Sequence, residues 1–142
     1  MGHIRTISHT ADIAYEITAA TREDLFATAV LAWKQSVVGN SEVAQTAQAE
    51  VWVEGIDPEE LLVNLLGEIN YFFEVRHWVT ARVDRIHIRH RGDGYYLEGM
   101  MTGEPFHPEK HQVLAEIKAA TFHQIDIKKT AGGFRTKIVF DI

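Results

Sequence analysis

The segment from Ser8 to Asp12, which reads SHTAD, concentrates residue types that enzymes and metal sites use. A serine, a histidine and an aspartate could in principle form a catalytic triad. However, triad members normally come from separate elements of a fold, so that their side chains converge, whereas neighbouring residues of a strand point to alternate faces. We therefore do not favour a triad. The segment by itself leaves open which of these residues carries a function.

A second candidate group of carboxylates lies at the other end of the chain. Asp141 is the penultimate residue, and Ile142 carries the α-carboxylate. The preceding residues are apolar enough to be held in a sheet, which would fix the two carboxyl groups beside each other. If Asp12 lies on a neighbouring strand, three sources of anionic oxygen converge, which is unfavourable unless a proton or a cation joins them. Hard cations such as Ca²⁺ and Mg²⁺ take carboxylate oxygens, so a divalent-cation site is one interpretation.

The region 116–128 is expected to form one long strand, with polar residues on both faces. Thr121 and His123 interrupt a face that is otherwise apolar. We favour a half-buried pair satisfied by hydrogen bonds; the alternative is that the pair shapes a polar pocket near Asp12. Lys118 lies on the opposite face. It is either a solvated lysine or a cation that contacts a partner or balances nearby carboxylates.

Other chemical signatures are weak or missing. His107 and His111, in the segment HPEKH, have a spacing that one helical turn could bring together, but the proline and the loop-like setting argue against a metal site. There is no Walker-type phosphate loop, no G-x-S-x-G nucleophile elbow and no H-E-x-x-H zinc helix. The sequence contains no cysteine, which removes disulfides, thiolate catalysis and zinc–sulfur sites.

The composition indicates a small acidic globular protein. The 142 residues carry a formal net charge of −6 and 46% are hydrophobic, which fits one domain, residues 1–142, with a substantial core. Nonspecific affinity for nucleic acid comes mainly from Lys and Arg, so any link to RNA is expected to run through another protein or a bound cation. No apolar run approaches the roughly 20 residues that a membrane helix needs. The lack of an apolar signal segment and of cysteine fits a cytoplasmic location.

Two amphipathic helices are predicted. The first spans 21–39, between a capping threonine and a terminal glycine, and its apolar residues recur at helical spacing. The second spans 57–75 and begins with a capping aspartate followed by a proline. Gly67 inside the second helix costs about 1 kcal/mol relative to alanine, and a close packing contact would explain its presence.

The remaining segments alternate apolar and polar residues, as strands do. In 78–90 the alternation slips between Val83 and Ile86, which predicts a β-bulge, and RGDG at 91–94 predicts a hairpin turn. The element order is therefore ββ-α-β-α-ββββ, an α+β fold in which two amphipathic helices pack on a mixed or mostly antiparallel sheet. The expected strands are 3–7, 12–17, 49–55, 78–90, 95–101, 116–128 and 134–142.

Several of these blocks together resemble the archease family in order and spacing. The blocks are SHTADI at 8–13, HPEKH at 107–111, EIKAATFHQIDI at 116–127 and the terminal FDI. The two helical segments also fit the family pattern, so the resemblance covers nearly the whole chain. No single block is specific, but four blocks in the same order make a strong resemblance.

The resemblance implies a function that is not enzymatic. Archeases are accessory proteins of the GTP-dependent RNA ligase that joins 3′-phosphate or 2′,3′-cyclic-phosphate ends to 5′-hydroxyl ends, as in tRNA splicing. They promote guanylylation of the ligase's active-site histidine and multiple turnover. In archeases the aspartate of the H-T-A-D motif, the penultimate aspartate and the C-terminal residue form a divalent-cation site. These positions match Asp12, Asp141 and Ile142, and a lysine implicated in activation matches Lys118.

The chain departs from the family pattern at a few positions. Ala14 and Tyr15 stand in a region where glycine is frequent, Asn64 replaces a frequent acidic residue of the second helix, and Phe134 replaces a common tryptophan. None of these is an implied cation ligand. Asn64 leaves open whether the ligase-facing surface is typical of the family.

We therefore hypothesise that the chain activates an RNA ligase through an acidic, cation-binding tip. Calcium is the cation expected in a crystal, with magnesium or manganese as alternatives. Lys118, Asp12, Asp141 and His9 are the residues expected to act on the ligase, RNA is expected to be met only through the ligase, and neither a membrane nor a small-molecule substrate is expected. The competing interpretation is a stand-alone cation-binding or chaperone-like module with a structural metal. A small hydrolase ranks last, because no nucleophile or positioned base is evident.

Overall fold

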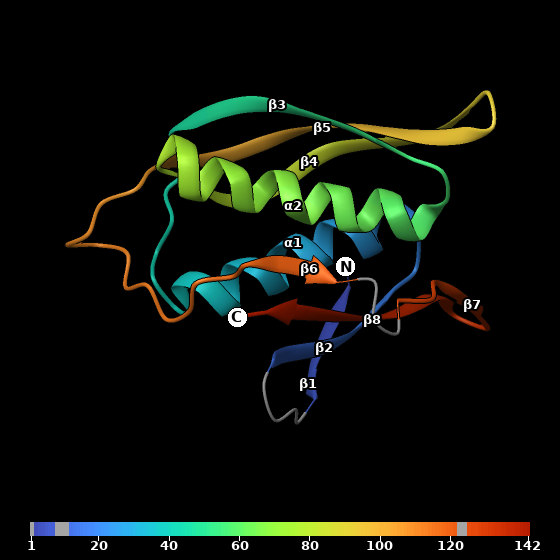
Figure 1. The fold of residues 1–142 in the computed structure, drawn as a ribbon, viewed down its shortest axis with the longest axis horizontal. Coiled ribbons are helices and arrows are strands. Elements are labelled where there is room, and N and C mark those ends of the chain that lie inside the picture. The colour runs from blue at the N-terminus through green and yellow to red at the C-terminus, as the bar shows by residue number, and fades with distance from the viewer. Residues whose placement is uncertain (1, 8–11, 122–124) are drawn as a thin grey trace.

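The computed structural model describes residues 2–7, 12–121 and 125–142, and for Thr121 it describes the backbone alone. Within this part of the chain, strands and helices follow each other in the predicted order, except that the long strand expected at 116–128 is replaced by two short ones (Figure 1). The elements are β1 (His3–Ile7), β2 (Asp12–Ala19), α1 (Arg22–Val38), β3 (Ala47–Gly55), α2 (Pro58–Arg76), β4 (Trp78–Arg91), β5 (Gly94–Pro105), β6 (Ala119–Thr121), β7 (Lys128–Thr130) and β8 (Gly133–Asp141).

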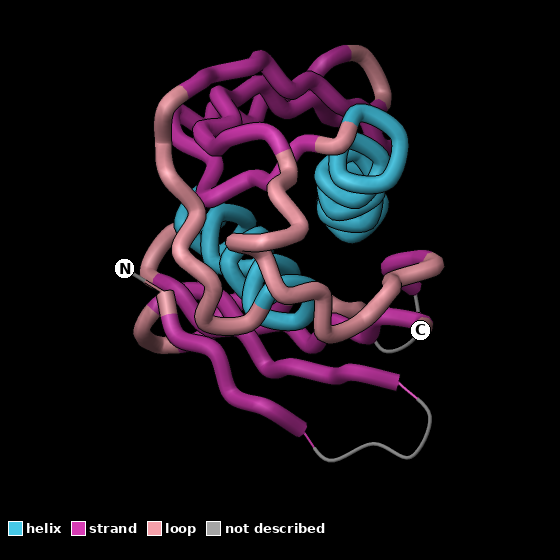
Figure 2. The backbone as a smooth tube through the Cα atoms, turned by 90° about the vertical axis from the view of Figure 1, so that its left-hand side faces the viewer, coloured by secondary structure: helices cyan, strands magenta, loops and turns pink. Residues whose placement is uncertain are grey.

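The strands are divided between two antiparallel sheets. β1, β2, β8 and β6 are neighbours in this order, and β7 also pairs with β8, whereas β3, β5 and β4 form the second sheet. The helices lie in the layer between the two sheets (Figures 1 and 2). Their buried side chains and those of both sheets form one hydrophobic cluster. The predicted α+β class, with antiparallel strands and two packed helices, is confirmed, but the described strands form two sheets in place of the one sheet that was expected.

Both helices begin where the capping residues predict, and α1 also ends at its predicted glycine. The Thr21 hydroxyl accepts a hydrogen bond from the Asp24 N–H at 3.1 Å, and the Asp57 carboxylate accepts one from the Glu60 N–H at 2.8 Å. At the end of α1, Gly39 has φ +57° and donates its N–H to the Gln35 carbonyl. These local bonds satisfy backbone groups that helix ends leave without partners.

A close packing contact, one reason considered for Gly67, is not found in the structure. The residue lies on the exposed side of α2, and a Cβ atom built there would meet nothing within 4 Å. The glycine therefore weakens the helix without any packing reason that the structure shows.

The bulge predicted in the fourth strand is confirmed. Between β4 and β5 the register passes from Asp84 opposite Met100 to His87 opposite Glu98, with a shift between the two pairs. Arg85, inside the shift, has φ +55°. Before the bulge Val83 packs in the core, and the extra residue lets Ile86 and Ile88 after it pack on the same core.

The single long strand expected over 116–128 is wrong. Among the described residues of this segment, only Ala119–Thr121 and Lys128–Thr130 pair with β8, one at each end of that strand. The residues beside them bond to α2 instead, because the Asn70 side chain donates to the Ile117 carbonyl and the Glu59 carboxylate accepts from the Ile127 N–H, each at 2.8 Å. Side chains of a helix thus satisfy backbone groups that a sheet ladder would otherwise pair. The predicted Thr121–His123 pair lies outside the described side chains.

Candidate functional site

The strand register places the two predicted aspartates opposite each other. β2 and β8 are antiparallel, and Asp12 is the partner of Asp141 at the end of the ladder. The next pair is Ile13 with Phe140, and Phe140 is fully buried in the core. Because a slip of one residue would turn Phe140 to solvent, core packing fixes the register and with it the opposition of the two carboxylates.

The third strand of this sheet brings Lys118 to the same place. β6 lies on the other side of β8, where Ala119 is opposite Asp141. The Lys118 N–H donates to the Asp141 carbonyl at 2.7 Å, and the lysine side chain is exposed. Ile142 follows Asp141 directly and is also exposed. The structure therefore gathers Asp12, Asp141, Ile142 and Lys118 at one end of the sheet. We call the pair Asp12 and Asp141, together with Ile142, the acidic row. His9 lies outside the described residues.

The chemistry of the acidic row suits a hard cation. Like charges that are directly opposite in an antiparallel pair destabilise it, and a divalent cation would reverse the sign of that interaction. Carboxylate oxygens are the ligands that Ca²⁺, Mg²⁺ and Mn²⁺ prefer. Among the described residues no group of three His, Cys, Asp or Glu side chains could hold a metal ion. The two aspartates therefore supply only part of a coordination shell. Further oxygens would have to come from the terminal carboxylate, the main chain, water or a partner.

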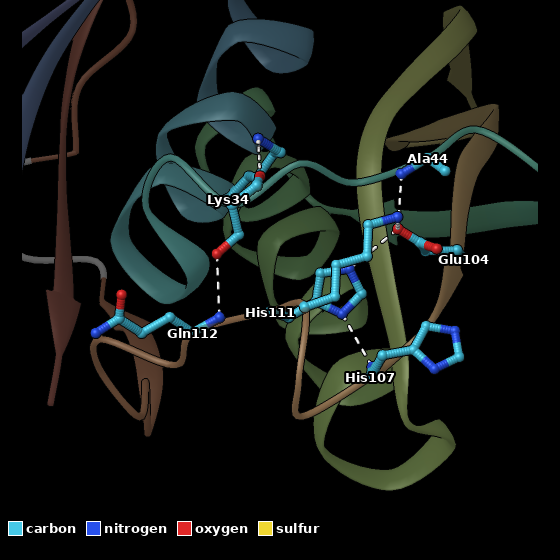
Figure 3. Close-up of polar contacts among 8 residues, drawn as sticks. Lys34, Ala44, Glu104, His107, His111 and Gln112 are labelled. Carbon is cyan, nitrogen blue, oxygen red and sulfur yellow. Dashed lines mark hydrogen bonds and ion pairs between the residues drawn. The ribbon is translucent and has the colours of Figure 1, made fainter.

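A second polar cluster, which the sequence did not reveal, consists of hydrogen-bond donors around the single carboxylate of Glu104 at the end of β5 (Figure 3). One oxygen of this buried side chain, Oε2, accepts hydrogen bonds from the Ala44 N–H at 2.7 Å and from the Lys110 ammonium at 2.7 Å. The same oxygen lies 3.0 Å from Nε2 of His111. Burial raises the pKa of Glu104, but the hydrogen bonds from Lys110, Ala44 and His111 outweigh it and lower the pKa to about 2.

The histidine pair of HPEKH belongs to this cluster and not to a metal site. The His107 N–H donates to Nδ1 of His111 at 3.0 Å, so the proton of a neutral His111 ring is on Nε2, where it donates to Glu104. Both ring nitrogens of this buried side chain are therefore engaged (Figure 3). This geometry agrees with the sequence-based argument against a metal site at His107 and His111. The sequence did not indicate that the Glu104 carboxylate would hold the His111 ring.

The Glu104 cluster fixes the path of the chain from β5 toward the acidic row. Two further hydrogen bonds attach the connecting segment to the end of α1 and the loop after it. The Gln112 N–H donates to the Ser41 hydroxyl at 3.0 Å, and the Leu114 N–H donates to the Val37 carbonyl at 2.7 Å. The segment then reaches Lys118 and Asp141. The buried cluster is structural, and its consequence is that the residues beside the acidic row have a defined position.

Asn64, the departure in the second helix, is not part of the acidic row. Its side chain is exposed and donates to the Glu54 carbonyl of β3 at 2.7 Å. That strand belongs to the other sheet. The substitution therefore leaves the surroundings of Asp12 and Asp141 unchanged.

Comparisons with known proteins agree with this architecture. The model of the archease protein family matches residues 5–142. Protein archease of Methanosarcina mazei is 35% identical over 136 residues, which covers 96% of this chain and 93% of the relative. Protein archease of Archaeoglobus fulgidus is 33% identical and covers 97% and 98% of the two chains.

Solved structures with the same fold come from two other organisms. The solution structure of protein 1598 of Methanobacterium thermoautotrophicum has a TM-score of 0.80 at 24% identity and covers 98% of both chains. The crystal structure of an archease from Thermotoga maritima, described as a possible chaperone, has a TM-score of 0.60 at 23% identity and covers 99% of this chain.

None of the helices in the described part of the chain is long and apolar enough to cross a membrane. The match of the family model over nearly the whole chain and relatives above 30% identity lead to one conclusion. The chain belongs to the archease family.

Proposed function

We propose that this protein is a non-enzymatic activator of a GTP-dependent RNA ligase that joins 3′-phosphate or 2′,3′-cyclic-phosphate ends to 5′-hydroxyl ends. In this proposal it promotes guanylylation of the ligase's active-site histidine and allows repeated turnover. The observation that carries the proposal is the register of β2 and β8, which opposes Asp12 and Asp141 at an exposed end of the sheet. Membership of the archease family supports the same assignment.

The acidic row would hold one divalent cation, with Asp12, Asp141 and the Ile142 carboxylate as its ligands from this chain. When bound, such a cation supplies neutralisation of the charge that develops in nucleotidyl transfer. The two aspartates present oxygens at an exposed sheet end, and the limited number of protein ligands leaves coordination positions for groups of the ligase or of GTP. Calcium, magnesium and manganese all fit oxygen ligands of this kind.

Lys118 and the acidic charge of the chain would serve recognition of the ligase. The lysine side chain is exposed, and its main-chain bond to Asp141 fixes its position beside the acidic row. An acidic chain with a net charge of −6 complements a basic enzyme that handles RNA, and such complementarity accelerates association and disfavours wrong partners. His9 is proposed as a further contact with the ligase.

The test is the formation of ligase–GMP from purified ligase, GTP and a divalent metal, with and without this protein. Wild-type protein should accelerate the reaction. Asp12→Asn and Asp141→Asn should reduce the rate to that of the ligase alone, because each removes a charged cation ligand. The matched control is Asp93→Asn, which makes the same change in the exposed turn between β4 and β5. It should retain full acceleration.

Two outcomes would end the proposal. The first is a folded wild-type protein that does not accelerate ligase–GMP formation. In that case a metal-dependent rise in thermal stability alone would favour the stand-alone module with a structural cation. The second is full acceleration by both aspartate variants, which would remove the acidic row from the mechanism. Hydrolysis of a phosphoester by this protein alone would instead support the interpretation of the protein as a small hydrolase.

A further inference from the structure

The sheet that carries the acidic row at one end of β8 also carries a concentration of positive charge toward the other end of that strand. The register places Arg5 of β1, Glu16 of β2 and Lys137 of β8 in one row across the sheet. Arg135 is two residues from Lys137 on the same strand, and it is opposite Lys128 of β7. Directly opposed residues, and residues two apart on one strand, share a face. We call Arg5, Lys128, Arg135 and Lys137 the cationic belt.

The belt faces away from the core. Between its members on β8 lies Thr136, and after them comes Ile138, both of which are buried on the side of the sheet that packs on α1. Lys128 and Arg135 are exposed. By the same alternation Lys137 and Asp141 lie on one face of β8. The acidic row and the cationic belt therefore lie toward opposite ends of that strand, and Val139, which lies between them on the same face, is buried.

Positive charge is in excess in the belt, although the chain as a whole is acidic. A shallow depression of about 480 Å³ is lined by the cations Lys128, Arg135 and Lys137 and by two carboxylates, Glu16 and Asp126. Glu16 is paired with Arg5 at 3.0 Å, and Asp126 lies 3.8 Å from Lys128. Each carboxylate is thus already close to one cation, and the four cations outnumber the two carboxylates.

This chemistry fits a phosphate backbone better than a protein surface. A protein interface needs an apolar centre, and none of the described residues that line the depression is hydrophobic. Lys and Arg on a shallow open face are what positions nucleic acid through its phosphates. Lys137 and Asp141 are four residues apart, which is roughly 13 Å along a strand.

We propose that the cationic belt contacts the phosphate backbone of RNA that is bound by the partner ligase. This inference rests on the proposed ligase partnership and changes one part of it. RNA would be held by the ligase and also touched by this protein. The contact would strengthen RNA binding during sealing and would play no part in guanylylation, which requires no RNA.

The experiment compares two reactions of the ligase with the same preparations of this protein. The first is ligase–GMP formation without RNA, and the second is multiple-turnover sealing of an RNA with a 3′-phosphate end. The belt variant combines Lys128→Gln and Arg135→Gln. The control variant combines Arg82→Gln and Arg89→Gln, which removes the same charge from exposed positions of β4. The control is matched further because Arg82 is ion-paired with Asp84, as Lys128 is with Asp126.

The belt variant should accelerate ligase–GMP formation as well as wild type, but it should raise KM for RNA about tenfold near 0.1 M monovalent salt, since each lost phosphate contact weakens binding severalfold. The difference from wild type should shrink as salt is added. The control variant should change neither reaction. An unchanged KM in the belt variant, or an equal rise in the control, would overturn the inference. Failure of wild-type protein in the first reaction would instead overturn the ligase partnership itself.

Discussion

The molecule holds carboxylates in two opposite ways. Glu104 is buried, and one of its oxygens is surrounded by a main-chain N–H, a lysine ammonium and an imidazole N–H. Asp12 and Asp141 lie at the end of a sheet, and the register sets them against each other. A carboxylate that is saturated with donors stabilises a fold. Two that are opposed weaken it until a cation joins them. The first arrangement is therefore structural, and the second is suited to binding a cation.

The largest expected effect is on the structural side of the comparison. Glu104→Gln removes the buried charge that three donors surround and leaves the Lys110 ammonium without its counter-ion. The free energy of unfolding should fall by about 3 kcal/mol, measured by urea denaturation at neutral pH. Glu98→Gln, on an exposed site of the same strand, should change it by less than about 0.5 kcal/mol. An equal effect of the two variants would refute the structural role of Glu104.

The same cluster predicts a dependence on pH. The folded-state pKa of Glu104 is about 2, below its ordinary value of 4.5, so the folded protein binds this proton more weakly than the unfolded chain. Its stabilising contribution is therefore fully present above about pH 4.5 and is lost as the pH falls toward 2. The difference in unfolding free energy between wild type and Glu104→Gln should shrink over this range. A difference that stays constant from pH 6 to pH 3 would contradict the assignment.

A smaller effect is expected where α2 holds the segment that leads to the acidic row. Asn70 accepts a hydrogen bond from the Trp33 indole at 3.0 Å and donates to the Ile117 carbonyl at 2.8 Å. Asn70→Ala leaves both groups without this partner and should lower the free energy of unfolding by about 2 kcal/mol. Amide exchange at Lys118, whose N–H bonds to Asp141, should accelerate in the variant. Unchanged exchange would show that Asn70 does not position this segment.

The smallest expected effect on stability is that of a substitution at Gly67. Gly67 lies on an exposed helix position with space for a methyl group. Gly67→Ala should therefore raise the free energy of unfolding by about 1 kcal/mol, through helix propensity alone. Thermal unfolding would measure it, and ligase–GMP formation should be unaffected. A loss of stability would mean that the glycine has a packing role after all.

Local signals predicted much of this structure. The caps of both helices, the bulge in β4 and the strands that frame the acidic row are encoded by residues close together in sequence. The sequence predicted that Asp12 and Asp141 would be close only if their two strands were neighbours. Alternation predicts which face of a sheet a side chain lies on, but it does not predict which strand lies beside it. The apolar residues of β8 indicated that the end of the chain is held in a sheet. The buried Phe140 explains why the register between β2 and β8 is fixed.

What the sequence could not predict depends on contacts between distant residues. The strand expected at 116–128 has the right alternation, but Asn70 and Glu59 of α2 take over two of its backbone groups. Glu104 lies outside the strand expected at 95–101, and its role could not be predicted because its donors include the main chain of Ala44, sixty positions earlier. In the same way, the cationic belt arises from three strands that only the sheet topology brings side by side.

The proposed function depends on the binding of a divalent cation by Asp12 and Asp141. The most direct test is thermal unfolding of wild type and Asp141→Asn, each with EDTA and with excess Ca²⁺. Without the cation the variant should be at least as stable as wild type, because the repulsion between opposed carboxylates is gone. Saturating Ca²⁺ should raise the midpoint of wild type by about 5–10 °C and leave the variant unchanged. An equal response of the two proteins, or none in wild type, would contradict the account.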